Sequence, residues 1–534
     1  MDGVSPYGVV DHATHVAGTI GAYGVIATAK GFSNRGTILE SDFVNDLSEM
    51  ASVTATNALH VSNHSYGISG GWWIWTPDGV NYYWVWNGDV TINTNQDWHF
   101  GFYDSYARTN DQVIYTAQNY LPVFSAGNER GGVEKGPASQ PVGHYEYSNG
   151  VVVVSYATRP LDDANGGFHT LTSYSVSKNA LVIGAVTNIV GGYAGSNSVG
   201  VAWFSSFGPT AEGRIKPDLC AGGVNVYSTF ATNTSSYGYD SGTSMSAPAV
   251  TGTLGLVLDI YERLYGTSQP MLSSTLKGIS LHTADECGTS AGPDYRFGWG
   301  LLNAQSAANL ITNNYTSHSL AFTKEVRLLS GDYIQFPVVL TGGQPFKATI
   351  VWTDPPGTPT SSKLNPTNHM LVNDLDLRVV SPTGVTNYPW VLNPNSPANA
   401  ATTGDNTVDN VEQVSIPNPT SGTYLMRVTH KGNLLNDLGQ TSYQNVSVML
   451  SGNTAQAPIV PNITSMAALT VSNTVALKWS SEVGRVYRIQ YRDNIASGSW
   501  QYATSELSAT KTNTAVTVSV AGLTNRFYRV AQIR

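Results

Sequence analysis

The chain has 534 residues, which is long enough for several domains. Its net charge of −9 gives no support for a nucleic-acid partner, because proteins that bind nucleic acids present a basic face. No apolar run approaches the length of a membrane span. With only two cysteines, Cys220 and Cys287, a disulfide framework is excluded, whereas a single bridge between them stays open.

Residues 11–19, DHATHVAGT, predict a short helix that begins close to His12 and turns Val16 and Ala17 inward. A histidine at the start of a helix is able to act as a general base. The alternatives are that His12 and His15 are ordinary polar residues or an i, i+3 metal pair. A metal pair is the weaker reading, because no third ligand follows at a suitable spacing.

Six of the twelve tryptophans lie in one short segment, residues 72–98. We interpret this segment as a hairpin insert that buries its aromatic rings against the rest of the domain. The alternative is that it forms one wall of a substrate cleft.

Residues 123–130, VFSAGNER, predict a buried strand that ends in a Gly-Asn loop. Asn128 is either a turn residue that tolerates left-handed geometry or a side-chain amide aimed at an oxyanion. Residues 180–186, ALVIGAV, predict a second buried strand. Continuous apolar strands that alternate with helices are typical of a parallel sheet covered on both faces.

Residues 241–248, SGTSMSAP, place Ser244 after a tight Gly-Thr turn, and an apolar stretch over 247–265 predicts a helix. The free N–H groups and the dipole at a helix N-terminus favour developing negative charge. This arrangement suits a serine nucleophile in acyl transfer. The alternative is a helix N-cap, for which Ser and Thr are common.

The three motifs, in the order His, Asn, Ser, resemble those of the subtilisin-like serine proteases. The resemblance covers residues 1 to about 315 and includes FSSFGP at 204–209 and KPD at 216–218. It implies that His12 is the general base, that Ser244 is the nucleophile and that Asn128 supplies the side-chain donor to the oxyanion.

The resemblance also implies a substrate-binding cleft. Residues 61–67, VSNHSYG, are similar to the strand of that family that pairs with the peptide backbone, so Ser65, Tyr66 and Gly67 are expected to bind substrate. The opposite wall of the first specificity pocket is then formed by Ser125, Ala126 and Gly127.

The family's catalytic carboxylate is not evident. The family order is Asp, His, Ser, and only Asp2 and Asp11 precede His12. Asp11 adjoins His12 on the same helix start, and Asp2 lacks an apolar strand before it. We therefore expect neither to orient His12, and we expect the chain to be a fragment that lacks its N-terminal strand. Ala13 replaces the Gly that usually follows the base.

Residues 316–453 predict an all-β domain of short strands separated by Pro, Gly and Asn turns. They resemble the jelly-roll domain that follows the catalytic domain in some alkaline subtilisin-like proteases. Clustered carboxylates there suit structural calcium, with the candidate ligands Asp374, Asp376, Asp409 and Glu412. The alternative is that these are solvated turn residues.

Residues 453–462, broken by Pro458 and Pro461, predict a linker. Beyond it, apolar residues alternate with polar ones in three runs, which indicates a small antiparallel sandwich over 463–534. It resembles the fibronectin-type modules of secreted bacterial proteins.

The sequence thus predicts an α/β subtilisin-like catalytic domain at 1–315, followed by two all-β domains. The predicted function is a secreted, monomeric serine endopeptidase of broad specificity that acts on proteins or peptides. The alternative is a catalytically silent peptide-binding relative that lacks the triad Asp.

Overall fold

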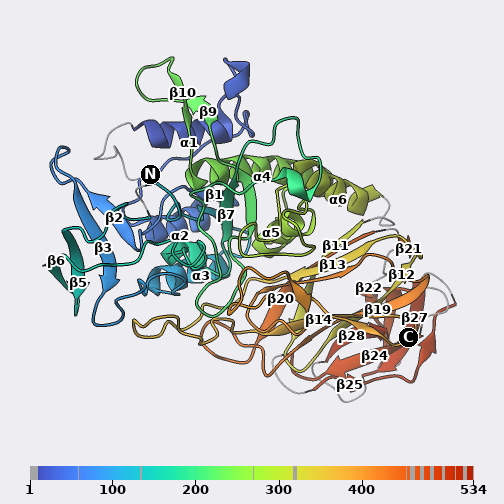
Figure 1. The fold of residues 1–534 in the computed structure, drawn as a ribbon. Helices are drawn as coiled ribbons and strands as arrows, with labels where there is room; N and C mark the ends of the chain where they lie inside the picture. The colour runs from blue at the N-terminus through green and yellow to red at the C-terminus, as the bar shows by residue number, and fades with distance from the viewer. Residues whose placement is uncertain are drawn as a thin grey trace.

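A computed structural model describes residues 10–57, 59–132, 135–268, 270–316, 321–452, 454–456, 463–469, 474–481, 486–495, 499–510, 513–520 and 526–532. Figure 1 shows an α/β region followed along the chain by all-β regions. Among the described helices, none is both long and apolar enough to cross a membrane.

A parallel sheet forms the centre of the α/β region. Its strands lie in the order β1 (Val61–His64), β4 (Leu121–Ser125), β7 (Leu181–Val186) and β8 (Leu219–Gly222). Every residue of β4 and β7 is buried. The strands predicted from 123–130 and 180–186 are therefore confirmed, and their lack of alternation follows from coverage of both faces.

Successive strand residues belong to two different cores, one on each face of the sheet. Val123 and Ile183 pack with α4 (Thr243–Tyr265), α5 (Ser273–His282) and α6 (Ala304–Thr316). Phe124 and Val182 pack with α2 (Asp46–Asn57) and α3 (Ser105–Thr116).

The N-terminal helix α1 (Asp11–Gly21) lies against α4 and against the hairpin of β9 (Val226–Thr229) and β10 (Tyr237–Asp240). Gly18 permits this approach, because a Cβ atom there would lie 2.1 Å from Thr229 Oγ1. Single 3₁₀ turns lie at Ala27–Ala29, Ser173–Val176 and Ser196–Ser198.

The tryptophan-rich segment contributes two strands of a separate sheet, in the order β2 (Trp72–Trp75), β3 (Tyr83–Asp89), β5 (His144–Ser148) and β6 (Val151–Ser155). Trp72 and Trp86 are buried, and the Trp72 indole donates to Pro160 O at 2.8 Å. Trp75 is exposed. The packing interpretation therefore holds for Trp72 and Trp86.

Cys220 and Cys287 are both free thiols in the structure. Both are buried in one small apolar cluster.

The first all-β region is a sandwich of two sheets. One has the order β11 (Ala321–Leu329), β20 (Tyr443–Gly452), β13 (Phe346–Val351), β18 (Val411–Ile416). The other has the order β15 (Thr386–Asn387), β14 (Leu375–Val380), β19 (Gly422–His430), β12 (Ile334–Leu340), β21 (Thr454–Gln456). Alternate residues of both sheets fill one shared core. A two-residue pair, β16 (Trp390–Val391) and β17 (Thr402–Thr403), lies beside them.

The C-terminal region also has two sheets, one with β22 (Ile463–Leu469), β23 (Thr474–Ser480) and β27 (Asn513–Ser519). The other has β24 (Val486–Arg492), β25 (Gln501–Tyr502), β26 (Leu507–Ser508) and β28 (Phe527–Gln532). Their core contains Trp479 and Tyr487. In the linker predicted at 453–462, Thr454–Gln456 is instead strand β21, because it pairs with β12. Residues 453 and 457–462 lie outside the described residues.

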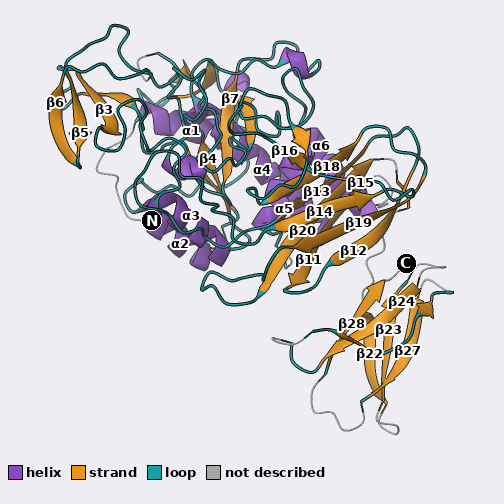
Figure 2. Ribbon diagram, turned by 60° about the horizontal axis from the view of Figure 1, so that its bottom comes forward, coloured by secondary structure: helices purple, strands orange, loops and turns teal. Residues whose placement is uncertain are grey.

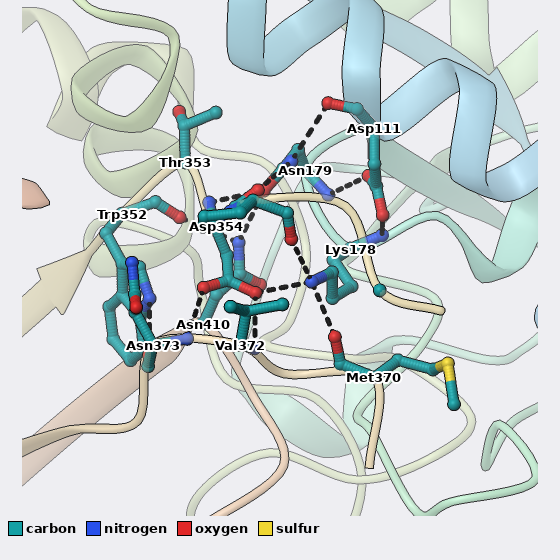
Figure 3. A network of polar contacts seen from close by, with 12 residues as sticks. Asp111, Lys178, Asn179, Trp352, Thr353, Asp354, Met370, Val372, Asn373 and Asn410 are labelled. Carbon is teal, nitrogen blue, oxygen red and sulfur yellow. Dashed lines mark hydrogen bonds and ion pairs between the residues drawn. The ribbon is translucent and has the colours of Figure 1, made fainter. Parts of the chain in front are cut away.

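The α/β region and the first sandwich share a buried polar network, drawn in Figure 3. The Lys178 ammonium pairs with Asp354 and donates to the carbonyls of Pro355 and Met370, each at 2.6 Å. Asn179 donates to Asp354 O at 2.8 Å. The side chains of Lys178 and Asp354 are both fully buried, so water does not reach the ion pair that joins the two regions.

Candidate active site

Ser244 is the second residue of α4, which begins at Thr243, ahead of the predicted start at 247. Its Oγ donates to Ser65 O at 3.2 Å, and Ser65 Oγ donates to Ser244 O at 2.9 Å. The Ser244 carbonyl is available because Pro248, one helical turn later, has no N–H to donate to it. This proline therefore couples the candidate nucleophile to the segment after β1.

Asn128 lies beside the same helix start. Its Oδ1 accepts hydrogen bonds from Thr243 N at 2.9 Å and Thr243 Oγ1 at 3.0 Å, which fixes the amide plane. A Cβ atom at Gly242 would lie 3.6 Å from Ser244 N and 3.7 Å from Asn128 Nδ2. The two nitrogens therefore border one small space, which the absent side chain of Gly242 leaves open.

His12 is an exposed residue in the first turn of α1, the helix that packs on α4. Loss of water around its ring lowers the pKa of His12, and the charge of Asp240 opposes this shift. Asp240 ends β10, far along the chain from His12, so no local motif indicated this partner. The lowered pKa favours the neutral imidazole, which is the form a general base requires.

The two aspartates considered from the sequence have different outcomes. Asp11 Oδ1 accepts a hydrogen bond from Ala231 N at 2.7 Å, so its carboxylate anchors the loop between β9 and β10. Asp2 lies outside the described residues. His15 is buried and its Nε2 bonds to Val226 O at 2.8 Å, which assigns it a structural contact.

The predicted substrate-binding residues come together at the carboxyl ends of β1 and β4. These strands pair in parallel, with His64 opposite Phe124, so Ser65, Tyr66 and Gly67 leave the sheet beside Ser125, Ala126 and Gly127. Gly127 N donates to Thr243 Oγ1 at 3.1 Å. Both segments therefore lie next to the start of α4, as expected of two walls of one cleft.

The four predicted calcium ligands do not fit a calcium site as they lie. Lys431 contacts Asp374 at 3.1 Å and Asp376 at 3.2 Å, so an ammonium group lies where a metal ion would be needed. Glu412 accepts from Leu377 N at 2.5 Å, whereas Asp409 turns away to Ile215 N at 2.8 Å. The described residues contain no group of three or more His, Cys, Asp or Glu side chains suited to a metal ion.

A buried hydrogen-bond chain beside the cleft was not expected from the sequence. Tyr66 donates to Asp46 Oδ2 at 3.1 Å and contacts His64 Nδ1 at 2.6 Å, and His64 Nε2 contacts Ser62 Oγ at 2.6 Å. Burial lowers the pKa of His64 to about 3, so its ring is neutral. No local sequence pattern predicts this series of hydrogen bonds, because Asp46 belongs to α2 whereas Tyr66 follows β1.

The chain is similar in sequence to known proteases. A family model described as the subtilase family matches residues 4–300. The C5a peptidase of Streptococcus pyogenes serotype M3 is 39% identical over 94 residues, which is 18% of this chain and 8% of that protein. Subtilisin DY of Bacillus licheniformis is 28% identical over 205 residues, 38% of this chain and 63% of that protein.

The serine protease AprX of Bacillus subtilis is 35% identical over 124 residues, 21% of this chain and 27% of that protein. This chain therefore spans less than two thirds of each of these relatives. Among solved structures, the self-cleaved protease domain of PatA aligns with a TM-score of 0.34 and 18% identity, over 57% of this chain and 83% of that chain. Because the family model covers more than half of its residues, the chain belongs to the subtilase family.

Proposed function

We propose that this protein is a serine endopeptidase that hydrolyses proteins or peptides through an acyl-enzyme on Ser244. The observation that carries the proposal is the space at Gly242, which Ser244 N and Asn128 Nδ2 both border. Two N–H donors at a helix N-terminus, beside a serine hydroxyl, suit the oxyanion of a tetrahedral intermediate.

In the proposed reaction, Ser244 Oγ turns from the Ser65 carbonyl towards His12, which takes its proton. The oxygen attacks the peptide carbonyl, and the two donors hold the resulting oxyanion. His12 then gives the proton to the leaving amine, which departs as the acyl-enzyme forms. Water, activated by His12 in the same way, releases the second product and restores Ser244.

One alternative has support from a specific contact. Ser244 Oγ donates to Ser65 O, and Asp11 is engaged with Ala231 N. An unaligned nucleophile and the lack of an orienting carboxylate at Asp11 favour a catalytically silent peptide-binding relative. Covalent labelling separates the two, because a silent relative binds peptides without forming an adduct.

A fluorophosphonate tests the nucleophile directly. The chain is expected to react at Ser244 and to hydrolyse denatured casein, whereas Ser244→Ala abolishes both. Asn128→Ala is expected to lower turnover by about 10²–10³-fold with little change in KM, the loss that removal of one such donor causes in subtilisin. The matched control is Ser241→Ala, an exposed serine that precedes the helix. Labelling that persists in Ser244→Ala would refute the assignment.

The remaining features of the proposal concern the whole protein. We propose that it is secreted and monomeric, with broad specificity next to the scissile bond. The low charged fraction of 12% agrees with secretion. We propose a jelly roll for the first β region and a fibronectin-type module for the second, supported by the two sheets of each around one core.

A further inference from the structure

A pocket of about 380 Å³ lies directly beyond the residues that contact Ser244. Tyr66, Gly67 and Ile68 form one side of it, immediately after Ser65. The start of α2 forms another side, and Tyr106 and Tyr174 complete it. Its volume lies within the range of about 300–1,000 Å³ that is typical of ligand pockets. A peptide bound along residues 65–67 therefore passes the mouth of this pocket.

The pocket contains a carboxylate without a neutralising partner. Asp46 is 9% exposed and accepts hydrogen bonds from Leu47 N at 2.7 Å, Tyr66 OH at 3.1 Å and Tyr174 OH at 3.3 Å. These donors are all neutral. Among the described residues that line the pocket, none is Lys, Arg or His. The Asp46 carboxylate is therefore held in place by neutral donors, and a cationic group of a ligand is able to pair with it.

Groups behind the pocket do not cancel this charge. The ring that contacts Tyr66 from the protein side belongs to His64, which is neutral because burial holds its pKa at about 3. The pKa of Tyr174 is raised by burial and then by the charge of Asp46, with a smaller contribution from Asp104. A second carboxylate thus adds to the negative potential.

The walls of the pocket also suit a cation. Tyr66, Tyr106 and Tyr174 present aromatic rings, joined by Phe43 at a ring-centroid distance of 6.2 Å from Tyr66. Aromatic faces attract ammonium and guanidinium groups, and the aliphatic stem of Lys or Arg packs on the same rings. Tyr106 is 46% exposed, so this wall is open to an entering side chain.

We propose that this pocket selects a cationic side chain, lysine or arginine, of the bound peptide, and that Asp46 is the specificity-determining residue. The proposal rests on the proposed function, because it takes residues 65–67 as the strand that holds the substrate. The broad specificity proposed above then applies to the substrate residue next to the scissile bond. A second substrate residue, farther along the peptide, is selected for its positive charge.

Asp46 also has a structural role, since it is the first residue of α2, where a carboxylate favours the helix dipole. Asp46→Asn removes the charge and keeps one oxygen that accepts from Leu47 N and Tyr174 OH, while the amide nitrogen replaces the oxygen that accepts from Tyr66 OH. The matched control is Asp42→Asn, which makes the same change of net charge in the segment that precedes α2, outside the lining of the pocket.

The test uses the full chain and quenched peptides of neutral sequence, in which one lysine or one norleucine occupies each position in turn. We expect one position before the cleaved bond where lysine exceeds norleucine by at least about tenfold in kcat/KM. Asp46→Asn abolishes this preference, Asp42→Asn retains it, and added NaCl weakens it. Equal rates for lysine and norleucine at every position, or a preference unchanged in Asp46→Asn, would overturn the proposal.

A separate readout distinguishes this proposal from the proposed function. If the chain neither cleaves peptides nor reacts with a fluorophosphonate, the endopeptidase assignment fails. Fluorescence anisotropy of the same peptides, labelled with a dye, then measures binding to the intact chain. Tighter binding of one lysine peptide, lost in Asp46→Asn, supports the pocket, whereas equal affinities for all the lysine and norleucine peptides refute it.

Discussion

The two joints of this molecule differ in how they are built. At the first, between the α/β region and the first sandwich, α5 is buried along its whole length against β13 and β20. Val351, Val411 and Met449 of the sandwich belong to the same core as the central sheet. At the second, the described hydrogen bonds to the C-terminal module run from Arg529 to Asp332, and that module has its own core. Figure 2 shows it standing apart.

This difference indicates which parts of the chain fold together. Every residue of α5 is buried, so this helix has no solvent face and needs partners on both sides. We therefore expect the α/β region and the first sandwich to form one cooperative unit. The hydroxyls of Ser274 and Thr275 meet Ser447 at 2.8 and 2.7 Å across the joint, which adds direction to the packing. The C-terminal module has a core of its own, around Trp479 and Tyr487, so we expect it to unfold as a separate unit.

The largest expected effect comes from breaking the buried ion pair at the first joint. Lys178→Met leaves the Asp354 carboxylate buried without its cation, which costs about 3–5 kcal/mol of unfolding free energy. Denaturant titration of the full chain measures this loss. The control is Arg263→Met, which breaks an exposed pair with Asp259 and costs about 0–1 kcal/mol. Equal stabilities of the two variants would show that the joint does not depend on this pair.

The second expected effect is a dependence of the first joint on pH. His282 is buried, and its nitrogens contact Thr349 Oγ1 and Ser451 Oγ, each at 2.8 Å. Burial holds the pKa of His282 well below the value of 6.5 that applies in the unfolded chain. The folded state therefore binds fewer protons, so its stability is full above pH 6.5 and falls as the pH is lowered.

Between pH 6.5 and pH 5 this group alone is expected to cost about 2 kcal/mol. Unfolding titrations at the two pH values measure the change, which His282→Asn is expected to reduce. His369→Asn, at an exposed histidine, serves as the control and leaves the pH dependence as it was. If the original chain, His282→Asn and His369→Asn all show the same dependence of stability on pH, His282 is not the cause.

The smallest expected effect is at the second joint. Arg529→Met removes the pair with Asp332 and is expected to cost less unfolding free energy than Lys178→Met, because Arg529 keeps contact with water whereas Lys178 is fully buried. Calorimetry of the full chain measures it, because separate units give separate transitions. A large shift in the unfolding temperature of the α/β region would contradict this prediction, because it would show that all three regions unfold as one unit.

Local sequence determined much of this protein. Apolar runs marked β4 and β7, and a Gly-Thr turn before an apolar stretch marked the start of α4. The roles of His12, Asn128 and Ser244 rest on motifs and stay predictions. Short sequence motifs are enough for such predictions, because the backbone conformation at a strand end or a helix start depends mainly on residues close by in the chain. The alternation after 474 likewise predicted the strands of the C-terminal module.

Only the tertiary structure decided what these elements meet. Lys178 pairs with Asp354, Asp46 receives Tyr66 and Tyr174, and Asp240 approaches His12, in each case from a distant part of the chain. The same holds for three of the predicted calcium ligands: Asp374 and Asp376 contact Lys431, and Glu412 contacts Arg378. A charged residue in a sequence shows no partner, because its energy depends on which opposite charges and how much water surround it after folding.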